Sequence, residues 1–254
     1  MKKIILILTA LFQSIIISTA LASSPGEAEY IHAEKIRSEF EPQIEHLAKN
    51  YPGPTANETI SAKAQIKTYH TLLAKSAQKG FPPALYRTAQ ILGSEPSTMY
   101  KNKTEICKLL SRAAEENLLS AKHANFFFCS PNTILFSLGT EEASNLMKPL
   151  ANALKLEDPY KEFYPLPAIK QPLCHIGSPH KPPSTSNPFA LIASTTKPAL
   201  SYDEYLADIH LLLYINQHEQ AIPSAKQHKE KAKELNCAGV SFFSGSETGA
   251  ARQK

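Results

Sequence analysis

Residues 72–129 contain one pattern twice, and this repetition constrains the fold more than any other feature of the chain. The first copy, LLAKSAQKG, begins at Leu72, and the second, LLSRAAEEN, begins at Leu109. The copies are 37 positions apart, and self-similarity at a period of this size is typical of helical repeat arrays. Each unit is expected to be a helix, a tight turn at Gly80 or Asn117, and a second helix.

The period continues once more and then fails. Leu146 stands 37 positions after Leu109, but Asp158 and Pro159 occupy the place where a second helix would begin. The third unit therefore loses its second helix or replaces it, as terminal repeats often do. No segment shows convincing strand alternation. We expect an all-α protein in which residues 23–158 form a short αα-repeat superhelix.

The chain begins like an exported protein. Two lysines precede an apolar run from Ile4 to Leu21, and Ala20-Leu21-Ala22 has the small-x-small pattern of a signal-peptidase site. We expect residues 1–22 to be a signal peptide that is cleaved after Ala22, which would make the protein periplasmic or secreted. The alternative is a retained anchor, because the run is just long enough to cross a bilayer. Cleavage would leave no stable membrane insertion.

Four cysteines in an exported chain favour disulfides over metal or redox chemistry. Four cysteines allow three pairings, and geometry favours one of them. Cys107 and Cys129 are equidistant from Leu118 at the turn of the second unit, so an antiparallel helix pair would bring them together. Cys174 is then left to pair with Cys237, which would tie the middle of the chain to its last helix.

The second half of the chain differs in character from the repeats. Nine of the nineteen prolines lie in residues 159–200, which are predicted to be a Pro-rich irregular segment that packs partly on the helices. A capping box from Ser201 to Glu204 then indicates the start of a helix. A C-terminal helical hairpin is expected over residues 201–243. Residues 244–254 are small and polar, as in a flexible tail.

The repeats resemble the Sel1-like repeat family, a relative of the tetratricopeptide repeat. In that family the first helix ends in Ala-Ala-x-x-Gly, and the second carries Ala-x-Tyr-x-Leu-Gly. The first unit here reads SAQKG at 76–80 and ALYRTA at 84–89, and the second reads AAEEN at 113–117 and AKHANF at 121–126. The second unit departs from the family most at Phe126, where a bulky ring replaces glycine.

This resemblance implies an αα-superhelix that acts as an adaptor for other proteins. Exported bacterial members exist, and some carry a disulfide between the two helices of a repeat. Periplasmic proteins of this kind also occur as immunity proteins that neutralise secreted toxins. We therefore expect a non-catalytic protein that binds a protein or peptide. Immunity against a toxin or effector is one alternative, and a secreted enzyme of unknown chemistry is another.

Three consecutive rings, Phe126, Phe127 and Phe128, span most of the circumference of the helix that carries them. At least one of them must point away from its own unit. It either packs on the third unit, which we favour, or anchors a partner. Tyr86, in the second helix of the first unit, is a further candidate for partner contact.

The sequence contains no motif for catalysis or cofactor binding, such as a Gly-rich phosphate loop or HExxH, so no cofactor is expected. The tightest metal-like group is Cys174, His175 and His180, which we expect to be a disulfide cysteine beside two loop histidines. His210 and His218 are expected on the surface. The formal net charge of +4 is too small to predict nucleic-acid binding.

Overall fold

The computed structural model describes residues 24–49, 56–94, 96–130, 137–176 and 199–244. The expected signal peptide (1–22), the expected tail beyond Ser244, and residues 177–198 of the Pro-rich segment lie outside the described residues. Almost every element of the described ranges is a helix, so the predicted all-α class is confirmed.

The α-helices described in the first part of the chain are α1 (Glu27–Lys49), α2 (Ala56–Gln78), α3 (Pro82–Ser94), α4 (Pro96–Met99), α5 (Lys103–Glu115), α6 (Leu119–Cys129) and α7 (Glu141–Ala153). The second part mixes short and long elements: η2 (Lys161–Phe163), β1 (Leu166–Pro167), η3 (Leu173–His175), β2 (Ala199–Leu200), α9 (Tyr202–Glu219), α10 (Ala225–Glu234) and α11 (Gly239–Ser244). β1 and β2 form a two-residue antiparallel ladder. The short helix α11 follows the predicted hairpin of α9 and α10 and was not expected.

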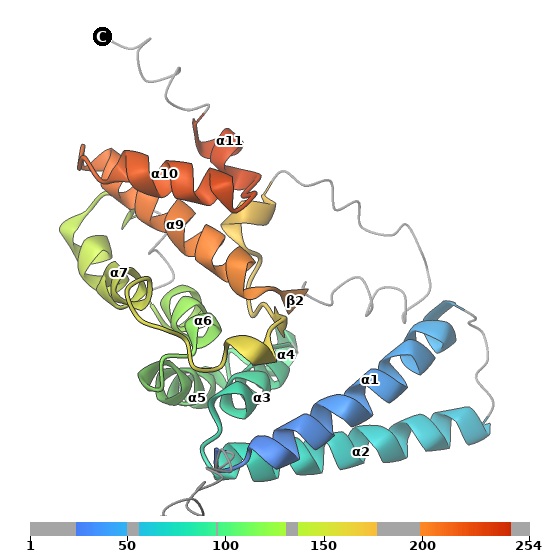
Figure 1. The fold of residues 1–254 in the computed structure, drawn as a ribbon. Helices are drawn as coiled ribbons and strands as arrows, with labels where there is room; N and C mark the ends of the chain where they lie inside the picture. The colour runs from blue at the N-terminus through green and yellow to red at the C-terminus, as the bar shows by residue number, and fades with distance from the viewer. Residues whose placement is uncertain (1–23, 50–55, 95, 131–136, 177–198, 245–254) are drawn as a thin grey trace, which may run out of the picture.

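The first two helices form a long antiparallel hairpin that projects from the rest of the molecule (Figure 1). Aromatic rings fill the space between them, and Phe40 of α1 packs edge-on against Tyr69 of α2 with ring centroids 5.8 Å apart. Tyr30 packs on Phe81, just before α3, at 5.3 Å. These contacts hold the base of the hairpin against the repeats.

The two turns predicted from the repeat have the same backbone conformation. Gly80 and Asn117 both have positive φ, at 89° and 67°. In each turn the amide that follows donates to a carbonyl near the end of the first helix, Ser76 O or Ala113 O. Glycine and asparagine are the residues that most readily adopt this conformation at a helix end. α2 with α3 and α5 with α6 are therefore the two predicted helix–turn–helix units.

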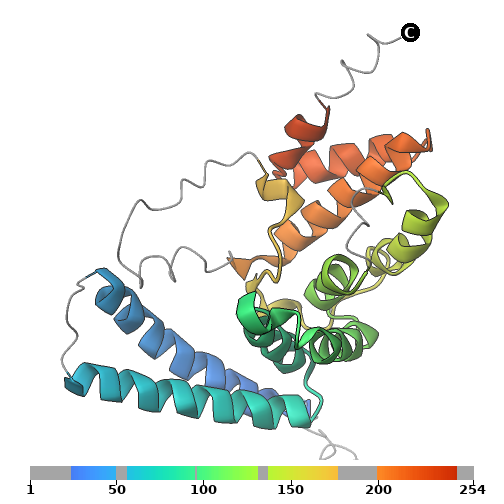
Figure 2. The ribbon, with the colours of Figure 1, turned by 180° about the vertical axis from the view of Figure 1, so that it is seen from behind.

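The third unit takes a second helix from a distant part of the chain. α7 is followed by an irregular segment, and α9 packs on both α6 and α7 (Figure 2). Asn216 of α9 accepts a hydrogen bond from Gly139 N at 2.9 Å and donates one to Ser144 Oγ at 2.9 Å. Gln220 also donates to Ser144 Oγ, at 2.7 Å. The predicted replacement helix is therefore α9.

α9 is the central helix of the molecule because its sequence is apolar around most of its circumference. Side chains buried on α9 include Tyr205, Ile209, Leu211, Leu212 and Leu213. A helix that is apolar on most sides must pack against other elements on several sides. α6 and α7 cover one part, α10 covers another, and the described part of the Pro-rich segment packs across its start.

The described parts of the Pro-rich segment, residues 159–176 and 199–200, pack on the helices as predicted. Leu166, Ile169 and Leu173 are buried, each with less than a tenth of its surface exposed. Backbone pairing adds to this packing, because Leu166 lies opposite Leu200 in the β1–β2 ladder. The segment thus forms part of the core.

Candidate functional site

The structure joins the four cysteines in the pairs expected from the sequence. Cys107 of α5 and Cys129 of α6 are linked, with Cα atoms 5.6 Å apart, and they brace the second unit. Cys174 of η3 is linked to Cys237, between α10 and α11, with Cα atoms 4.7 Å apart. The second link attaches the Pro-rich segment to the C-terminal helices. No free cysteine remains in the described part of the chain.

The four side chains considered for partner contact are buried. Phe126, Phe127 and Phe128 expose between 5% and 7% of their surfaces, and Tyr86 exposes none. The physical reason is that α6 is covered from two directions, by α7 and by α9, so rings that leave their own unit enter the core. The three rings therefore pack on neighbouring helices. None of them is an exposed anchor for a partner.

A buried histidine–aspartate pair joins α6 to α9. Nε2 of His123 lies 2.6 Å from Oδ2 of Asp208, and Oδ1 of Asp208 accepts a hydrogen bond from the Cys174 amide at 2.7 Å. His123 and Asp208 expose 4% and 0% of their surfaces. Such a pair can orient a base in catalysis only beside a nucleophile and a substrate. Here it is enclosed by Phe127 and Tyr205, and it fixes three segments together.

A second buried carboxylate attaches the Pro-rich segment to α6. Oδ2 of Asp158 accepts hydrogen bonds from the Leu119 amide at 2.9 Å and from the Tyr164 hydroxyl at 2.8 Å. A carboxylate at this end of a helix is stabilised by the backbone amides and the helix dipole. Burial, with the nearby Asp158 charge, raises the pKa of Tyr164 well above its ordinary value, so the phenol remains a donor.

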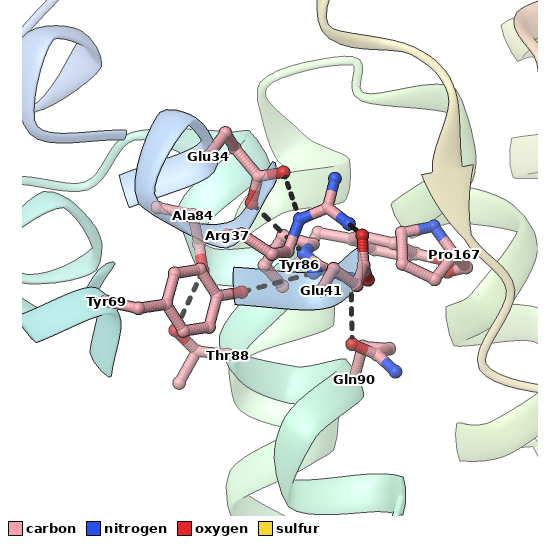
Figure 3. Close-up of polar contacts among 10 residues, drawn as sticks. Glu34, Arg37, Glu41, Tyr69, Ala84, Tyr86, Thr88, Gln90 and Pro167 are labelled. Carbon is pink, nitrogen blue, oxygen red and sulfur yellow. Dashed lines mark hydrogen bonds and ion pairs between the residues drawn. The ribbon is translucent and has the colours of Figure 1, made fainter. Parts of the chain in front are cut away.

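A charged cluster fixes the α1–α2 hairpin to α3 (Figure 3). Arg87 is 6% exposed, donates to the Tyr69 hydroxyl at 3.1 Å, and lies 3.4 Å from Glu34. Arg37 forms two salt bridges, from Nε to Oε2 of Glu34 at 2.7 Å and from Nη1 to Oε2 of Glu41 at 2.6 Å. Two guanidinium groups thus face two carboxylates, and the balanced charges hold the helices together instead of attracting a charged ligand.

An open groove of about 640 Å³ lies where α7, α9 and α10 meet. Its lining combines apolar surface with two imidazoles, two amides and charges of both signs. The polar members include His210, His228, Gln217, Gln227, Lys155 and Glu234. α9 and α10 supply most of these side chains, and the end of α7 supplies the opposite wall. Because the signs balance, the groove suits a polar ligand of low net charge.

The two imidazoles of this groove are in direct contact. Nδ1 of His210 lies 2.8 Å from Nδ1 of His228, so one ring carries its proton on Nδ1 and donates to the other. Burial lowers the pKa of His210 to about 4, helped by His228 and Lys231, and burial also lowers the pKa of His228. Both rings are therefore neutral near pH 7. His210 is half-buried at the wall of this open groove, and His218 is exposed as expected.

A smaller groove of about 350 Å³ runs between α6 and α7. Leu146, Leu150 and the edge of Phe126 form its apolar floor, and Lys122 and Asn125 lie at its rim. The side chain of Lys122 donates to Asn117 at 2.7 Å, so this rim cation is already engaged. The groove contains no group of converging ionisable side chains.

No three histidine, cysteine or carboxylate side chains form a ready metal cluster within the ranges that the structure describes. The predicted loop histidine His175 lies beside the Cys174 disulfide, with Nε2 3.6 Å from Glu204, and His180 is outside the described residues. None of the helices in the described ranges has the length and apolar content needed to span a membrane.

The His210–His228 contact was not predicted from the sequence. The equidistance rule that pairs Cys107 with Cys129 depends on two helices that meet at a tight turn. Here five residues separate α9 from α10, and His210 lies in the middle of one helix whereas His228 lies near the start of the other.

The arrangement can bind a polar ligand in the α7–α9–α10 groove, and its imidazole pair can accept, donate or share a proton there. Comparisons with protein-family models, with curated proteins and with solved structures find no significant match to this chain. The resemblance to Sel1-like repeats thus stays a prediction based on the residues quoted above.

Proposed function

We propose that the chain is an exported αα-repeat protein of the Sel1-like kind, and that it binds a protein or peptide partner without catalysis. The observation that supports this function best is the open groove where α7, α9 and α10 meet. Gln217 and Gln227 offer amide donors and acceptors of the kind that pair with a peptide main chain. Lys155 and Glu234 offer contacts for side chains of either charge.

The walls of the groove are held in place before any partner arrives. Asn216 and Gln220 bond α9 to Ser144 of α7, and the Cys174–Cys237 link holds the end of α10 near the start of α9. A preformed surface loses less conformational entropy on binding than a mobile one. This rigidity supports a dedicated partner over a set of weak ones.

Export is part of the same proposal. Two cysteine pairs at disulfide distance fit an oxidising compartment, because disulfides are rare in reducing ones. Cleavage after Ala22 would release the chain into the periplasm or the medium. Cell fractionation with N-terminal sequencing tests this part, and an intact N-terminus in the membrane fraction would replace release with anchoring.

Site-specific photocrosslinking tests the proposed binding face. A photoreactive residue at Gln227, which is exposed in the groove, should capture the same protein repeatedly from the native compartment. The same residue at Thr68, exposed on α2, is the matched control and should capture much less of it. A toxin or effector as the captured protein would make this an immunity protein. Equal capture at both positions would count against the groove.

The imidazole pair favours one second candidate, a hydrolytic or proton-transfer enzyme. His210 and His228 are two ionisable side chains that converge in an open groove, which is a common feature of active sites. No serine, threonine or cysteine is among the residues that line this groove, so none of them offers a hydroxyl or thiol nucleophile. Turnover of ester, amide or phosphoester substrates that disappears in His228→Gln would support catalysis over binding alone.

A further inference from the structure

We propose that His210 and His228 are two ligands of a divalent metal ion of the zinc class, bound at the groove between α7, α9 and α10. The two side chains come from helices that pack together along their length. Their Nδ1 atoms face each other at 2.8 Å and line the open groove, so an ion in solution can reach them. The ion would bind in the same groove as the proposed partner, but its binding does not depend on that partner.

The separation of the two nitrogens is close to what a metal ion requires. Two imidazole nitrogens at about 2.0–2.1 Å from a tetrahedral zinc ion lie about 3.3 Å apart. His210 and His228 would have to separate by only about half an ångström to admit an ion. Both rings are only half-buried, and both line the groove wall.

The protonation state of the pair suits a metal ion. A metal ligand must be a neutral imidazole with a free lone pair. In the Nδ1–Nδ1 contact one proton lies between two basic nitrogens, and a bound ion would take the place of that proton. The proton moves to Nε2 of the ring that held it, or to solvent, so both Nδ1 lone pairs point at the ion.

Further ligands come from the groove and from water. Glu234 and Lys231 both line the same groove and both act electrostatically on His210, in opposite directions. The carboxylate of Glu234 is paired with Lys231 at 2.8 Å, and both side chains are more than half exposed. An exposed pair of this kind is easily exchanged. Glu234 could therefore turn to the ion, which gives two histidines, one carboxylate and an open position for water, the donor set of many accessible zinc sites.

A purely structural role is the competing explanation. The Nδ1–Nδ1 hydrogen bond would then serve only to join α9 to α10. The two explanations differ in what they predict for an added metal ion. A structural hydrogen bond binds none, whereas a ligand pair binds one ion per chain and releases it when both rings become protonated.

Calorimetric titration of Zn²⁺ into the untagged, metal-free exported chain tests the site. We expect one ion per chain, and tetrahedral Co²⁺ bands in the visible spectrum when Co²⁺ replaces Zn²⁺. His210→Gln and His228→Gln should each weaken binding at least about tenfold, because even outer-sphere changes cost that much at metal sites. Glu234→Gln should weaken binding while leaving the Nδ1–Nδ1 contact intact. His32→Gln, at an exposed position on α1, is the matched control and should bind normally.

Circular dichroism of each variant in chelator shows that a loss of binding is not a loss of fold. Absence of saturable Zn²⁺ binding by the folded parent chain would overturn the proposal. So would equal affinity in the parent, His210→Gln and His228→Gln. Unchanged affinity in Glu234→Gln would overturn the carboxylate assignment.

Discussion

The hydroxyl oxygen of Tyr86 lies 2.8 Å from the hydroxyl oxygen of Tyr205, although 119 residues separate the two in the chain. Tyr86 donates its one proton to Pro167 O at 2.7 Å. Tyr205 has one proton to share between the Tyr86 oxygen and Leu166 O, which lies 3.2 Å away. Burial raises the pKa of both phenols far above the ordinary value, so both remain protonated. The two rings thus join the first unit, β1 and α9 in one buried cluster.

Removing either hydroxyl should destabilise the fold. Tyr86→Phe leaves the carbonyl of Pro167 without this donor, and Tyr205→Phe does the same to Leu166. We expect each change to lower the free energy of unfolding by about 1–3 kcal/mol, the cost of a buried unsatisfied polar group. Urea unfolding measures the loss.

The double variant distinguishes a shared cluster from two separate bonds. Because the hydroxyls contact each other, the combined loss should be smaller than the two single losses added together. Tyr100→Phe, at a position that is 72% exposed, is the matched control and should change stability by less than about 0.5 kcal/mol. Strict additivity of the two core changes would show that the 2.8 Å contact carries no energy.

The two disulfides should contribute unequally. The Cys107–Cys129 link closes 22 residues, and the Cys174–Cys237 link closes 63. In the chain-entropy model their removal costs about 3 and about 4 kcal/mol. Thermal unfolding of the two double-alanine variants should therefore rank the 174–237 variant as the less stable. Mass mapping of a non-reduced digest checks the pairing, and a Cys107–Cys174 peptide would refute it.

A single methyl group at Gly239 should disrupt the junction of α11 with η3. A Cβ there would lie 2.3 Å from Leu173 O and 2.9 Å from Leu211. The backbone carbonyl of Leu173 cannot move far enough to relieve this clash. Gly239→Ala should therefore lower the free energy of unfolding by about 2 kcal/mol or more. Gly93→Ala in α3 is the control, since its nearest atoms are 3.7 Å away and alanine favours a helix by up to about 1 kcal/mol. Equal melting temperatures for the two variants would contradict the close approach.

Stability should fall as the pH decreases through the range where the histidine pair titrates. The folded chain holds His210 at a pKa of about 4, below the ordinary value of 6.5, so the unfolded chain binds more protons in between. The stabilisation is complete above about pH 6.5 and is lost as the pH falls toward about 4. Allowing for solvent screening of the half-exposed ring, we expect a loss of about 1 kcal/mol.

The comparison that isolates this effect is between the parent chain and His210→Asn, both in chelator. Carboxylates elsewhere titrate in both proteins, so their contribution cancels in the difference. The difference in free energy of unfolding should shrink as the pH is lowered from 7 to 4. A constant difference would mean that the pair does not titrate as described.

Local features of the sequence predicted the local structure well. Gly80 and Asn117 mark the two turns because left-handed backbone strongly selects these residue types. The capping box of Ser201 and Glu204 begins α9 as expected, with both of its hydrogen bonds present. The Cys107–Cys129 pairing followed from the same antiparallel geometry. Each of these depends on residues within about one repeat length of each other.

Long-range placement could not be predicted in the same way. The cover of Phe126, Phe127 and Phe128 by two further helices depends on where α9 docks, and no local pattern encodes that. The contact of His210 with His228 likewise depends on how α9 and α10 cross after a five-residue connection. Amphipathic spacing tells which face of a helix is buried, but not which partner buries it.

The delayed second helix of the third unit has a consequence for the order in which the molecule assembles. During synthesis the chain emerges from its N-terminus, so α1 to α7 are available before α9. Before α9 is synthesised, the apolar sides of α6 and α7 that it covers face solvent. A partly folded chain that exposes such surface is prone to aggregation. Closing this long connection is also the slowest kind of contact to form. The helices of the first two units are therefore available early, and α9 covers them only when the C-terminal part of the chain arrives.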